Sequence, residues 1–553
     1  MYDYVIVGGG SAGCALAHRL SEDGSKRVCL LEAGPSDKGN ALISMPGGVI
    51  PLVRGLLANW KFWSVPQPNL AGRSVYLPRG KVLGGSSCIN AMVNIRGHAW
   101  DYDHWASLGC EGWSYRDVLP WFRRCENFEA DVPARDSYHG RGGPLNVAER
   151  RFTNPLSKAF LDAAQAAGHK PNPDFNGAEQ EGVGSYFVYQ KDGERCSNAR
   201  AYLREAEQRP NLTVLTGAHA TKILFEGKRA VGVQYLRGGE TLEARANAEV
   251  ILAAGSFQSP QLLMLSGVGP REELARHGIP LLHELPGVGQ NLQDHLDVVV
   301  ETREKTRLSA SLHPSTLWRT LVALFQYLFG RSGELTSNVA EVGGFLKSSP
   351  AEPIPDLQWH FVPVMNVRHG LDLSSAFKYH GYLVMTCDLR PLSRGRVGLR
   401  SADPLAPPLI DPNAGAHLRD IDKLVIAIRE SREVLKQAPF DPHRLVETMP
   451  GPEVQTDEQL REYVRQTAEF VYHPVGTCKM GVDAQAVVDP RLRVHGLEGL
   501  RVVDASIMPT LVGGNTNQPS TMIGEKGAAM ILEDAQRAAS GVAVEAVATR
   551  RAA

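Results

Sequence analysis

The chain has 553 residues, which is too long for one compact core and predicts two or more domains. Hydrophobic residues make up 43% and charged residues 22%, so disordered, collagenous, coiled-coil and small disulfide-stapled proteins are excluded. There are 59 Lys and Arg against 60 Asp and Glu, and the formal net charge of −1 provides no field to attract phosphate backbones. We therefore expect no nucleic-acid partner.

The eight cysteines form no Cys-x-x-Cys pair, so neither a zinc site nor a disulfide framework is indicated, and we expect reduced thiols in a cytoplasmic protein. No His-Glu-x-x-His motif occurs, and no catalytic metal is expected. Residues 4–7 already form an apolar run, without the basic and longer apolar regions of an export signal. The longest apolar stretch, 317–329, is interrupted by polar residues and is too short to span a membrane.

The first 32 residues predict a β-α-β unit. Residues 4–7 form an apolar run that ends in glycines, 12–20 have helix-forming composition, and 28–31 form a second apolar run. Strands of this continuous apolar kind are typical of a parallel sheet with helices on both faces. Similar runs occur far along the chain, at 212–215, 231–235, 250–253 and 500–503. The sequence therefore predicts an α/β fold with a Rossmann-like, doubly wound sheet assembled from discontinuous segments.

A second domain is expected to be inserted into the first. Residues 301–472 contain amphipathic helices, such as 421–436, and extended stretches, such as 382–387. We assign residues 1–155, 196–300 and 474–535 to the dinucleotide-binding domain, and residues 156–195 and 301–473 to an inserted α+β substrate-binding domain. The Ala-rich residues 536–553 are expected to form a flexible tail.

The turn after the first strand carries the first chemical motif. Its residues Gly8-Gly9-Gly10-Ser11-Ala12-Gly13 match G-x-G-x-x-G, which allows the amides of a helix N-terminus to approach a diphosphate. Glu32 ends the next strand, where a carboxylate accepts hydrogen bonds from a ribose diol. A carboxylate there disfavours a 2′-phosphate, so FAD or NAD is preferred to NADP.

The same turn also matches G-x-S-x-G, the nucleophile elbow of α/β-hydrolases, with Ser11 as the nucleophile. An elbow serine follows an inner strand and needs an oxyanion amide from an earlier one, but only one strand precedes Ser11. The hydrolase interpretation is therefore disfavoured.

Further blocks resemble the glucose–methanol–choline (GMC) family of FAD-dependent oxidoreductases. They are Arg-Gly-Lys-Val-Leu-Gly-Gly-Ser-Ser-Cys-Ile-Asn at 79–90, Gly-Ser-Phe-Gln-Ser-Pro at 255–260, Tyr-His-Pro-Val-Gly-Thr-Cys at 472–478, and the segment 504–519. The resemblance covers about residues 2–535. Within the family, the stretches 335–341 and 407–413 are most similar to bacterial alkanol dehydrogenases, with polyethylene glycol and choline dehydrogenases close by.

The resemblance implies FAD as the cofactor and His473 and Asn517 as the catalytic residues. His473 would take the hydroxyl proton, as a histidine with a pKa near 6.5 can do at neutral pH, and Asn517 would orient the same oxygen. Some relatives anchor FAD through a histidine where this chain has Ile89, so non-covalent binding is expected. The expected cofactor contacts are Gly8, Gly10, Ser11, Ala12, Gly13, Glu32, Ala33, Val82, Gly84, Gly85, Ser86, Asn90, Ala91, Met92, Val93, Ala220, Asp504, Ala505, Asn515 and Gln518.

The function implied is oxidation of an alcohol, most simply a primary one, to the aldehyde by hydride transfer to flavin N5. The similarity to alkanol dehydrogenases favours a quinone-type electron acceptor. A choline dehydrogenase, an oxygen-using oxidase of the same family and a non-enzymatic flavoprotein are the alternatives. Which alcohol is the substrate, and what the oligomeric state is, does not follow from the sequence. Candidate pocket walls are Val471, Tyr472, Trp359 and Phe361, with an ordinary core position as the equal alternative for each.

Residues 315–330 have leucines at helical spacing, widened by aromatic residues, with a narrow polar strip. One interpretation is a buried helix or a dimer contact. The other is a surface that rests peripherally on the inner face of a membrane, which would bring lipid-dissolved alcohols and quinones to the enzyme.

Overall fold

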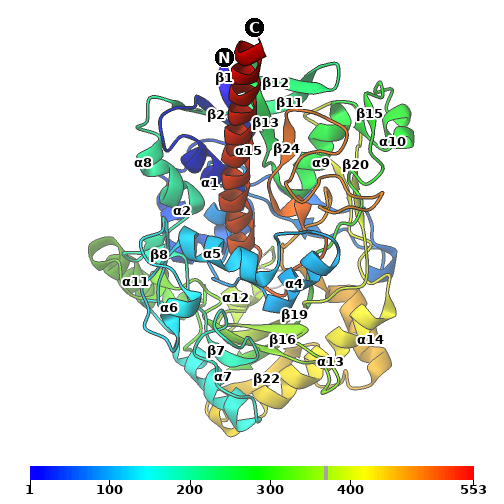
Figure 1. The fold of residues 1–553 in the computed structure, drawn as a ribbon. Helices are drawn as coiled ribbons and strands as arrows, with labels where there is room; N and C mark the ends of the chain where they lie inside the picture. The colour runs from blue at the N-terminus through cyan, green and yellow to red at the C-terminus, as the bar shows by residue number, and fades with distance from the viewer. Residues whose placement is uncertain (366–370, 553) are drawn as a thin grey trace.

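A computed structural model of the chain describes residues 1–365 and 371–552, with side chains described up to residue 540. Within this part of the chain, two seven-stranded sheets each carry their own apolar core. Figure 1 shows the first sheet in the upper half of the molecule and the second in the lower half. The predicted α/β fold with two domains is confirmed.

The first sheet contains every strand predicted for the dinucleotide-binding domain. Its order is β10-β2-β1-β13-β12-β11, with β24 pairing β13. The central strands run parallel, whereas β11, β12 and the first part of β13 form an antiparallel meander, so the predicted strand 231–235 lies outside the parallel part. The bounds are β1 (Tyr2–Val7), β2 (Val28–Glu32), β10 (Leu212–Thr216), β11 (His219–Glu226), β12 (Arg229–Arg237), β13 (Glu240–Leu252) and β24 (Leu500–Val502).

Helices cover this sheet. α1 (Ser11–Leu20) connects β1 to β2, and α9 (Gly255–Leu265) follows β13. α15 (Asn517–Ala552) packs along α1, and the contact is so close that a Cβ at Gly524 would lie 2.6 Å from the backbone oxygen of Ala12. Residues 536–553 were expected to form a flexible tail, and in the described part α15 continues as a helix to Ala552. Its composition explains this, since alanine is the strongest helix former.

The second sheet is antiparallel and has the order β22-β16-β19-β18-β17-β7, with β23 pairing β16. α13 (Leu418–Leu435) and α7 (Pro155–Ala166) pack on it, and Figure 1 shows both below the sheet. The predicted helix 421–436 and strand 382–387 are thus confirmed. The bounds are β7 (Gly182–Ser185), β16 (Leu296–Glu304), β17 (Val342–Leu346), β18 (Leu357–Val362), β19 (Gly381–Asp388), β22 (Arg444–Met449) and β23 (Glu469–Phe470).

The strand pairing of the second sheet also places one domain boundary earlier in the chain than predicted. β16 begins at Leu296, so the second sheet starts before residue 301. Phe62 and Leu77, from the N-terminal segment 1–155, also belong to the second core, because the chain crosses between the sheets there. The remaining helices and strands are α2 (Ala41–Ser44), α3 (Val49–Val53), α4 (Ala99–Ser107), α5 (Tyr115–Cys125), α6 (Arg135–Tyr138), α8 (Arg204–Ala206), α10 (Arg271–Arg276), α12 (Ser374–Lys378), α14 (Asp457–Thr467), β3 (Phe62–Trp63), β4 (Tyr76–Leu77), β5 (Glu126–Phe128), β6 (Leu145–Val147), β8 (Gln190–Lys191), β9 (Glu194–Arg195), β14 (Val268–Gly269), β15 (His283–Glu284), β20 (Arg396–Gly398) and β21 (Leu409–Asp411).

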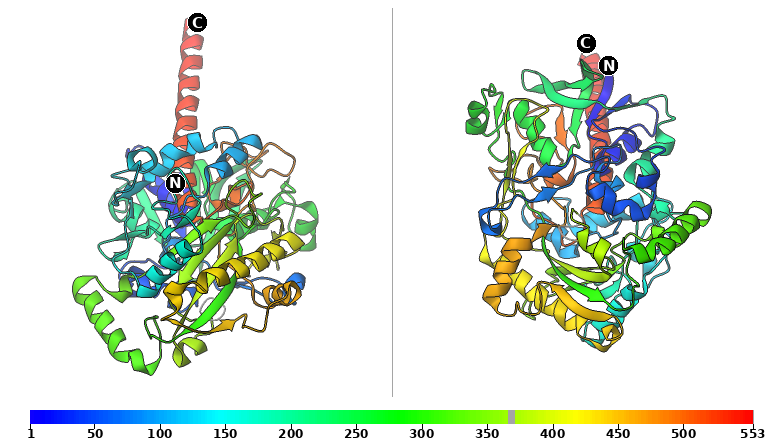
Figure 2. Two further views of the ribbon diagram at one scale, coloured as in Figure 1. Left: turned by 90° about the horizontal axis from the view of Figure 1, so that it is seen from below. Right: turned by 180° about the vertical axis from the view of Figure 1, so that it is seen from behind.

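The apolar helix at 315–330 forms but is not buried. α11 (Leu317–Gly330) projects from the protein in both views of Figure 2. Ala323 and Tyr327 are its buried residues, whereas Trp318 is 76% and Phe329 78% exposed. The buried-helix interpretation is therefore wrong. None of the described helices is long and apolar enough to cross a membrane.

Candidate active site

The glycine turn lies at the carboxyl end of β1, where the backbone is crowded. A Cβ at Gly8 would lie 2.4 Å from the carbonyl oxygen of Ala253, and Gly8 has φ +102°; a Cβ at Gly13 would lie 1.9 Å from the oxygen of Gly8. Only glycine fits either position. Gly10, the N-cap of α1, provides no side-chain hydrogen bond, so the first-turn N–H groups are available to an anionic ligand.

Glu32 fixes this turn to the end of β2. Its Oε2 accepts the N–H of Gly9 at 2.9 Å, and its Oε1 accepts the N–H of Gly34 at 2.7 Å. Burial raises the pKa of Glu32 to about 7, and the two amide donors oppose that shift. A carboxylate can accept about four hydrogen bonds, so two acceptor positions remain for a ribose diol.

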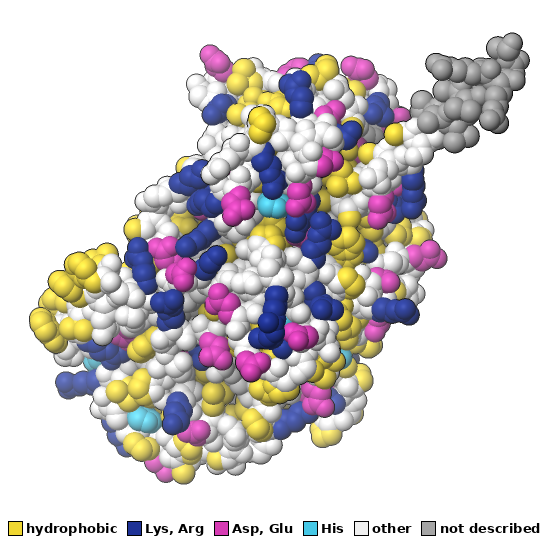
Figure 3. Space-filling view, turned by 60° about the vertical axis from the view of Figure 1, so that its left-hand side comes forward, with side chains coloured by type: hydrophobic (Ala, Val, Ile, Leu, Met, Phe, Trp, Pro, Cys, Tyr) yellow, Lys and Arg dark blue, Asp and Glu magenta, His cyan; other side chains and the backbone are white. Residues whose placement is uncertain are grey.

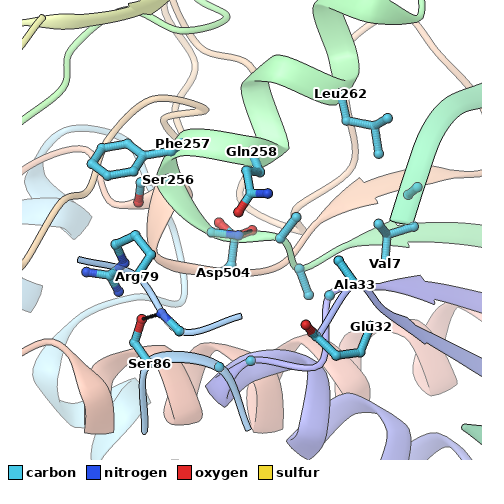
Figure 4. A pocket seen from close by; sticks show the side chains of 18 of the residues that line it. Val7, Glu32, Ala33, Arg79, Ser86, Ser256, Phe257, Gln258, Leu262 and Asp504 are labelled. Carbon is cyan, nitrogen blue, oxygen red and sulfur yellow. Dashed lines mark hydrogen bonds between the residues drawn. The ribbon is translucent and has the colours of Figure 1, made fainter. Parts of the chain in front are cut away.

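A long cleft starts at the glycine turn and ends beside the loop that follows β24. Figure 4 shows Glu32 and Ala33 on one side, Arg79 and Ser256 on the other, and Asp504 between them. The predicted cofactor residues that line it are Gly8, Gly10, Ser11, Ala12, Glu32, Ala33, Gly85, Ser86, Ala220, Asp504 and Ala505. The others lie outside the lining: Gly13, Val82, Gly84, Asn90, Ala91, Met92, Val93, Asn515 and Gln518.

Several residues outside the lining have structural partners. Asn90 Oδ1 accepts from Arg195 at 2.9 Å and from the N–H of Met92 at 3.0 Å, which shapes the segment 90–92. Gln518 Nε2 donates to buried Glu126 at 2.9 Å and therefore faces away from the cleft.

Arg79 is a cleft residue that the sequence did not assign a role, although it opens the block 79–90. Its Nη1 donates to the carbonyl oxygen of Tyr472 at 2.7 Å. Burial lowers the pKa of Arg79 to about 10, and the nearby carboxylate of Asp294 opposes this. Among the described residues that line the cleft, it is the one Arg or Lys, and it places a positive charge beside Tyr472 and Asp294.

Asp504 orders the far end of the cleft. Its Oδ2 accepts the N–H of Gly255 at 2.9 Å and the hydroxyl of Ser259 at 2.6 Å, while Oδ1 accepts from Ser506. Burial raises the pKa of Asp504. With its oxygens held by these donors, Asp504 joins the start of α9 to the loop after β24, and the backbone of Ala505 faces the cleft.

His473 lies on a constrained backbone. Its N–H donates to Asp294 Oδ1 at 2.7 Å, and the preceding Tyr472 has φ +68°. Its side chain is 8% exposed, and burial lowers the pKa well below the usual value, helped by the nearby His295, His360 and Arg79. His473 is therefore neutral at pH 7 and able to accept a proton.

The hydrogen bonds around His473 define its tautomer. Gln358 Nε2 donates to Asn515 Oδ1 at 3.1 Å, which leaves the Asn515 amide nitrogen to donate to His473 Nε2 at 3.2 Å. Nδ1 of His473 lies 3.0 Å from Nδ1 of His295, so it carries the ring proton and donates it there. Nε2 is thus the basic atom. The sequence did not single out His295 or Gln358.

The contacts place a different asparagine beside His473 from the predicted Asn517. Asn517 Oδ1 accepts from Ser11 Oγ at 2.8 Å, so Asn517 ties the start of α15 to the glycine turn. Asn515, two residues earlier, is the asparagine beside His473. Both had been named, but the geometry exchanges their positions relative to the base.

The alternative chemistries find no support. Ser11 donates to an amide oxygen rather than to a histidine, so it has no general base and is not an elbow nucleophile. No group of three or more His, Cys, Asp or Glu in the described part of the chain could hold a metal ion. All eight cysteines are buried and form no disulfide.

These residues fit FAD. The space beside the glycine turn, which a Cβ would fill, suits a diphosphate, and Glu32 suits a ribose diol. The neutral His473 lies where the carboxyl edge of the first sheet meets the second sheet. Together the fold and the cleft define a dinucleotide-dependent redox enzyme.

Comparison with known proteins gives the family. Models of the GMC oxidoreductase family match residues 2–297 and 391–524, and the chain belongs to this family. An alcohol dehydrogenase (acceptor) of Pseudomonas putida is 50% identical over 96% of both chains. The oxygen-dependent choline dehydrogenase of Brucella melitensis is 44% identical over 96% of this chain and 95% of its own.

Comparison with solved structures agrees with this family assignment. A formate oxidase of Aspergillus oryzae, studied for its FAD modification, is 27% identical with a TM-score of 0.91, over 97% of this chain and 99% of its own. The pyridoxine 4-oxidase of Mesorbium loti is 30% identical with a TM-score of 0.85, over 95% of this chain and 98% of its own. The family resemblance inferred from the sequence is confirmed.

Gly10→Ala tests the cleft. A Cβ at Gly10 has its nearest protein atom 4.0 Å away, so the chain should fold, but the methyl group would stand in the cleft. We expect the purified variant to hold about tenfold less FAD per chain, measured from flavin absorbance, with an unchanged circular dichroism spectrum. Gly481→Ala, where a Cβ meets only ordinary contacts at 3.4 Å, is the control. Full FAD content in Gly10→Ala would contradict the assignment.

Proposed function

We propose that this protein oxidises a primary alcohol to its aldehyde, with non-covalently held FAD as the immediate acceptor and a quinone-type molecule as the final one. One observation carries the proposal: Nε2 of buried His473 lies 3.2 Å from the amide nitrogen of Asn515, beside a dinucleotide cleft. An alcohol oxygen that contacts both groups, in place of their mutual hydrogen bond, would receive a hydrogen bond from the amide and give its proton to the imidazole.

The residues of this chain would handle the proton and the oxygen. FAD, when bound, supplies the two-electron acceptor for the hydrogen that leaves carbon with its electron pair. Nε2 of His473 takes the hydroxyl proton as the C=O bond forms, and the amide of Asn515 holds the oxygen. His295 holds the imidazole in the required tautomer through Nδ1. The C–H and O–H bonds break, and one aldehyde and one protonated imidazole result.

The relatives support an alcohol as the substrate. The Pseudomonas putida relative is an alcohol dehydrogenase that uses an acceptor, and the Brucella relative is a choline dehydrogenase. Choline, itself a primary alcohol, remains the second candidate because of the 44% identity. An acceptor-dependent relative at higher identity favours a quinone-type acceptor over oxygen.

Non-covalent FAD binding is supported by the surroundings of Ile89. This residue is 3% exposed and packs in an apolar cluster with Val82 and Cys88. Its side chain has no nucleophilic atom with which to attach a flavin.

Contact with a membrane surface is supported by α11. Figure 3 shows hydrophobic side chains gathered on the lobe at the left of the view, where α11 lies. Leu317, Trp318, Phe325 and Phe329 are 63% to 78% exposed there. With a net charge of −1, binding would depend on buried apolar area rather than on anionic lipid.

The cofactor proposal predicts the behaviour of the purified protein. It should be yellow, and acid precipitation should release the flavin into the supernatant, because unfolding removes every non-covalent contact. Flavin that stays with the pellet, seen by absorbance after washing, would mean covalent attachment at a residue other than Ile89.

Stopped-flow measurement of flavin reduction by a primary alcohol distinguishes the roles of His473, Asn515 and Asn517. His473→Ala should reduce flavin about 100-fold or more slowly, because no other group takes the proton. Asn515→Ala should slow flavin reduction about tenfold, because one hydrogen bond to the alcohol oxygen, which gains negative charge as its proton leaves, would be lost. Asn517→Ala should lose FAD more readily but keep the rate of the filled fraction within about threefold. The opposite result for the two asparagines would restore Asn517 as the catalytic partner.

Membrane contact is tested by flotation with neutral phosphatidylcholine vesicles. The protein should float with the vesicles, and high salt should not release it, since the contact is apolar. The double variant Leu324→Glu and Phe325→Glu should stay in the soluble fraction with an unchanged melting temperature, because both side chains are solvent-exposed. Unaltered protein that fails to float would contradict the proposal.

A further inference from the structure

The peptide bond that precedes His473 is held from both sides by charged side chains. Arg79 Nη1 donates to the carbonyl oxygen of Tyr472 at 2.7 Å, and Asp294 Oδ1 accepts the N–H of His473 at 2.7 Å. These two backbone groups belong to one planar peptide unit. Arg79 and Asp294 together form a peptide clamp, which fixes the backbone from which the imidazole extends.

The clamp lies where the strand pairing of the second sheet is interrupted. β23 pairs with β16, and the next pairing along the chain joins Gln293 to Val475. Between these two pairings, the segment 294–295 faces the longer segment 471–474, which cannot continue the ladder. Tyr472, in the longer segment, has φ +68°. A non-glycine residue keeps such a conformation only where its surroundings enforce it, and the clamp supplies the partners that the ladder does not.

Asp294 also connects the backbones of the two histidines. Its Oδ1 accepts the N–H of His295 at 2.8 Å as well as that of His473. The Nδ1 atoms of the two rings lie 3.0 Å apart. Because one oxygen holds both backbones, the hydrogen bond between the rings depends on Asp294.

The second oxygen of Asp294 has no such structural partner. Oδ2 is buried, and no residue in the described part of the chain donates a hydrogen bond to it. Asp420, another buried aspartate that ties two backbone N–H groups of a loop, uses both oxygens, with Leu392 and Ser393 as donors. A buried carboxylate oxygen without a donor is costly. A use for its negative charge follows from the reaction, because the imidazole of His473 becomes positive when it takes the hydroxyl proton.

The charge of Asp294 depends on pH near neutrality. Burial raises the pKa of Asp294 to about 7, and the two backbone N–H donors and the positive charge of Arg79 oppose this shift. The carboxylate is therefore mainly protonated below about pH 7 and negatively charged above it. Protonation at Oδ2 leaves Oδ1 able to accept both N–H groups, so the clamp persists at low pH.

The groups around Asp294 leave it as the one whose charge changes near pH 7. The titratable and charged groups near it are Arg79, His295, Asp297, Cys387, Tyr472 and His473. Burial raises the pKa of Cys387 and Tyr472 well above the usual values and lowers the pKa of both histidines, so these four groups are neutral there. Arg79, with a pKa lowered to about 10 by burial, stays positive, and the negative charge of Asp297 raises the pKa of Asp294.

We propose that Arg79 and Asp294 position the base: the clamp sets the place of the His473 imidazole, and the Asp294 carboxylate offsets the positive charge that the ring gains with the proton. The inference rests on the proposed function, in which the hydroxyl proton passes to Nε2 of His473. Both are positioning residues, because they act through His473 and not on the alcohol. Since Arg79 also lines the cofactor cleft (Figure 4), the base is held from the wall of the cleft itself.

Asp294→Ala removes both the acceptor and the charge. We expect flavin reduction by butanol, measured by stopped flow per filled cofactor, to be at least about tenfold slower from about pH 5.5 to about pH 8.5, since a small displacement of a base has an effect of this size. Asp420→Ala is the matched control, because Asp420 is also buried and also holds two backbone N–H groups, and its rate should stay within about twofold. An unchanged rate in Asp294→Ala would overturn the inference.

Asp294→Asn separates the charge from the clamp and covers the case in which Asp294→Ala fails to fold. The amide oxygen can replace Oδ1, but no negative charge forms. The rate constant of the unaltered enzyme divided by that of the variant should be within about twofold of one near pH 5.5, and should rise to about tenfold near pH 8.5, the equivalent of about one pKa unit. A carboxylate with a merely structural role would give a ratio independent of pH, and that result would overturn the use of the charge.

Arg79→Ala tests whether the two residues act on the same peptide. It should also slow flavin reduction about tenfold or more, per filled cofactor. Because both residues act through one peptide unit, Arg79→Ala combined with Asp294→Ala should be within about threefold of the slower single variant. Effects that multiply in the double variant would mean that the two residues act independently, and there would be no clamp.

A spectroscopic measurement does not depend on alcohol oxidation. In proton NMR spectra of the FAD-loaded protein, the proton shared by the Nδ1 atoms of His295 and His473 should give a downfield resonance that is missing in His473→Ala. The resonance should remain in Asp294→Asn and Asp420→Ala and disappear in Asp294→Ala. If no alcohol reduces the flavin but this pattern is found, the proposed function fails and the clamp stands. If the resonance persists in Asp294→Ala, the clamp fails whatever the substrate is.

Discussion

The close approach of backbone to backbone at the carboxyl edge of the first sheet is the constraint on which the rest of the structure depends. Gly8 contacts the backbone of Ala253, Gly13 contacts Gly8, and a Cβ at Gly85 would lie 2.8 Å from Cα of Gly10. Three parts of the chain, far apart in sequence, are thus fixed within backbone contact of one another. The cleft exists because these contacts leave no side chains in the space where a diphosphate would lie.

The register of the second sheet places His473, the proposed base, next to Pro474, which lines this cleft. β23 pairs with the start of β16, with Phe470 opposite Leu296, and the N–H of Val471 donates to the carbonyl oxygen of His295 at 2.9 Å. This pairing puts His295 and His473 side by side after the two strands separate. Asn515, from the loop before α15, completes the group. The arrangement proposed for catalysis is therefore made where the second sheet meets the loop before α15, and neither could form it alone.

The sequence predicted what depends on local pattern and failed where tertiary geometry decides. The parallel strands, the glycine turn and Glu32 have strong local signals, and they form as expected. Asn515 and Asn517 could not be told apart, because their directions follow from the loop backbone, including φ +155° at Gly514. α11 has the pattern of a buried helix, but none of the elements in the described part of the chain covers its outer side, which therefore forms a surface. Arg79 was overlooked because its block was interpreted through its glycines.

The discontinuous first sheet has a consequence for how the protein is made. Its central strands come from residues 2–7, 28–32, 212–216, 240–252 and 500–502, so the sheet combines the first and nearly the last residues of the folded part. During synthesis, a ribosome-bound chain lacks β24, Asp504 and the start of α15 until almost all of it has emerged, and such distant pairing is slow to form. The complete cleft can thus form only when nearly the whole polypeptide has emerged, which places its assembly late in folding.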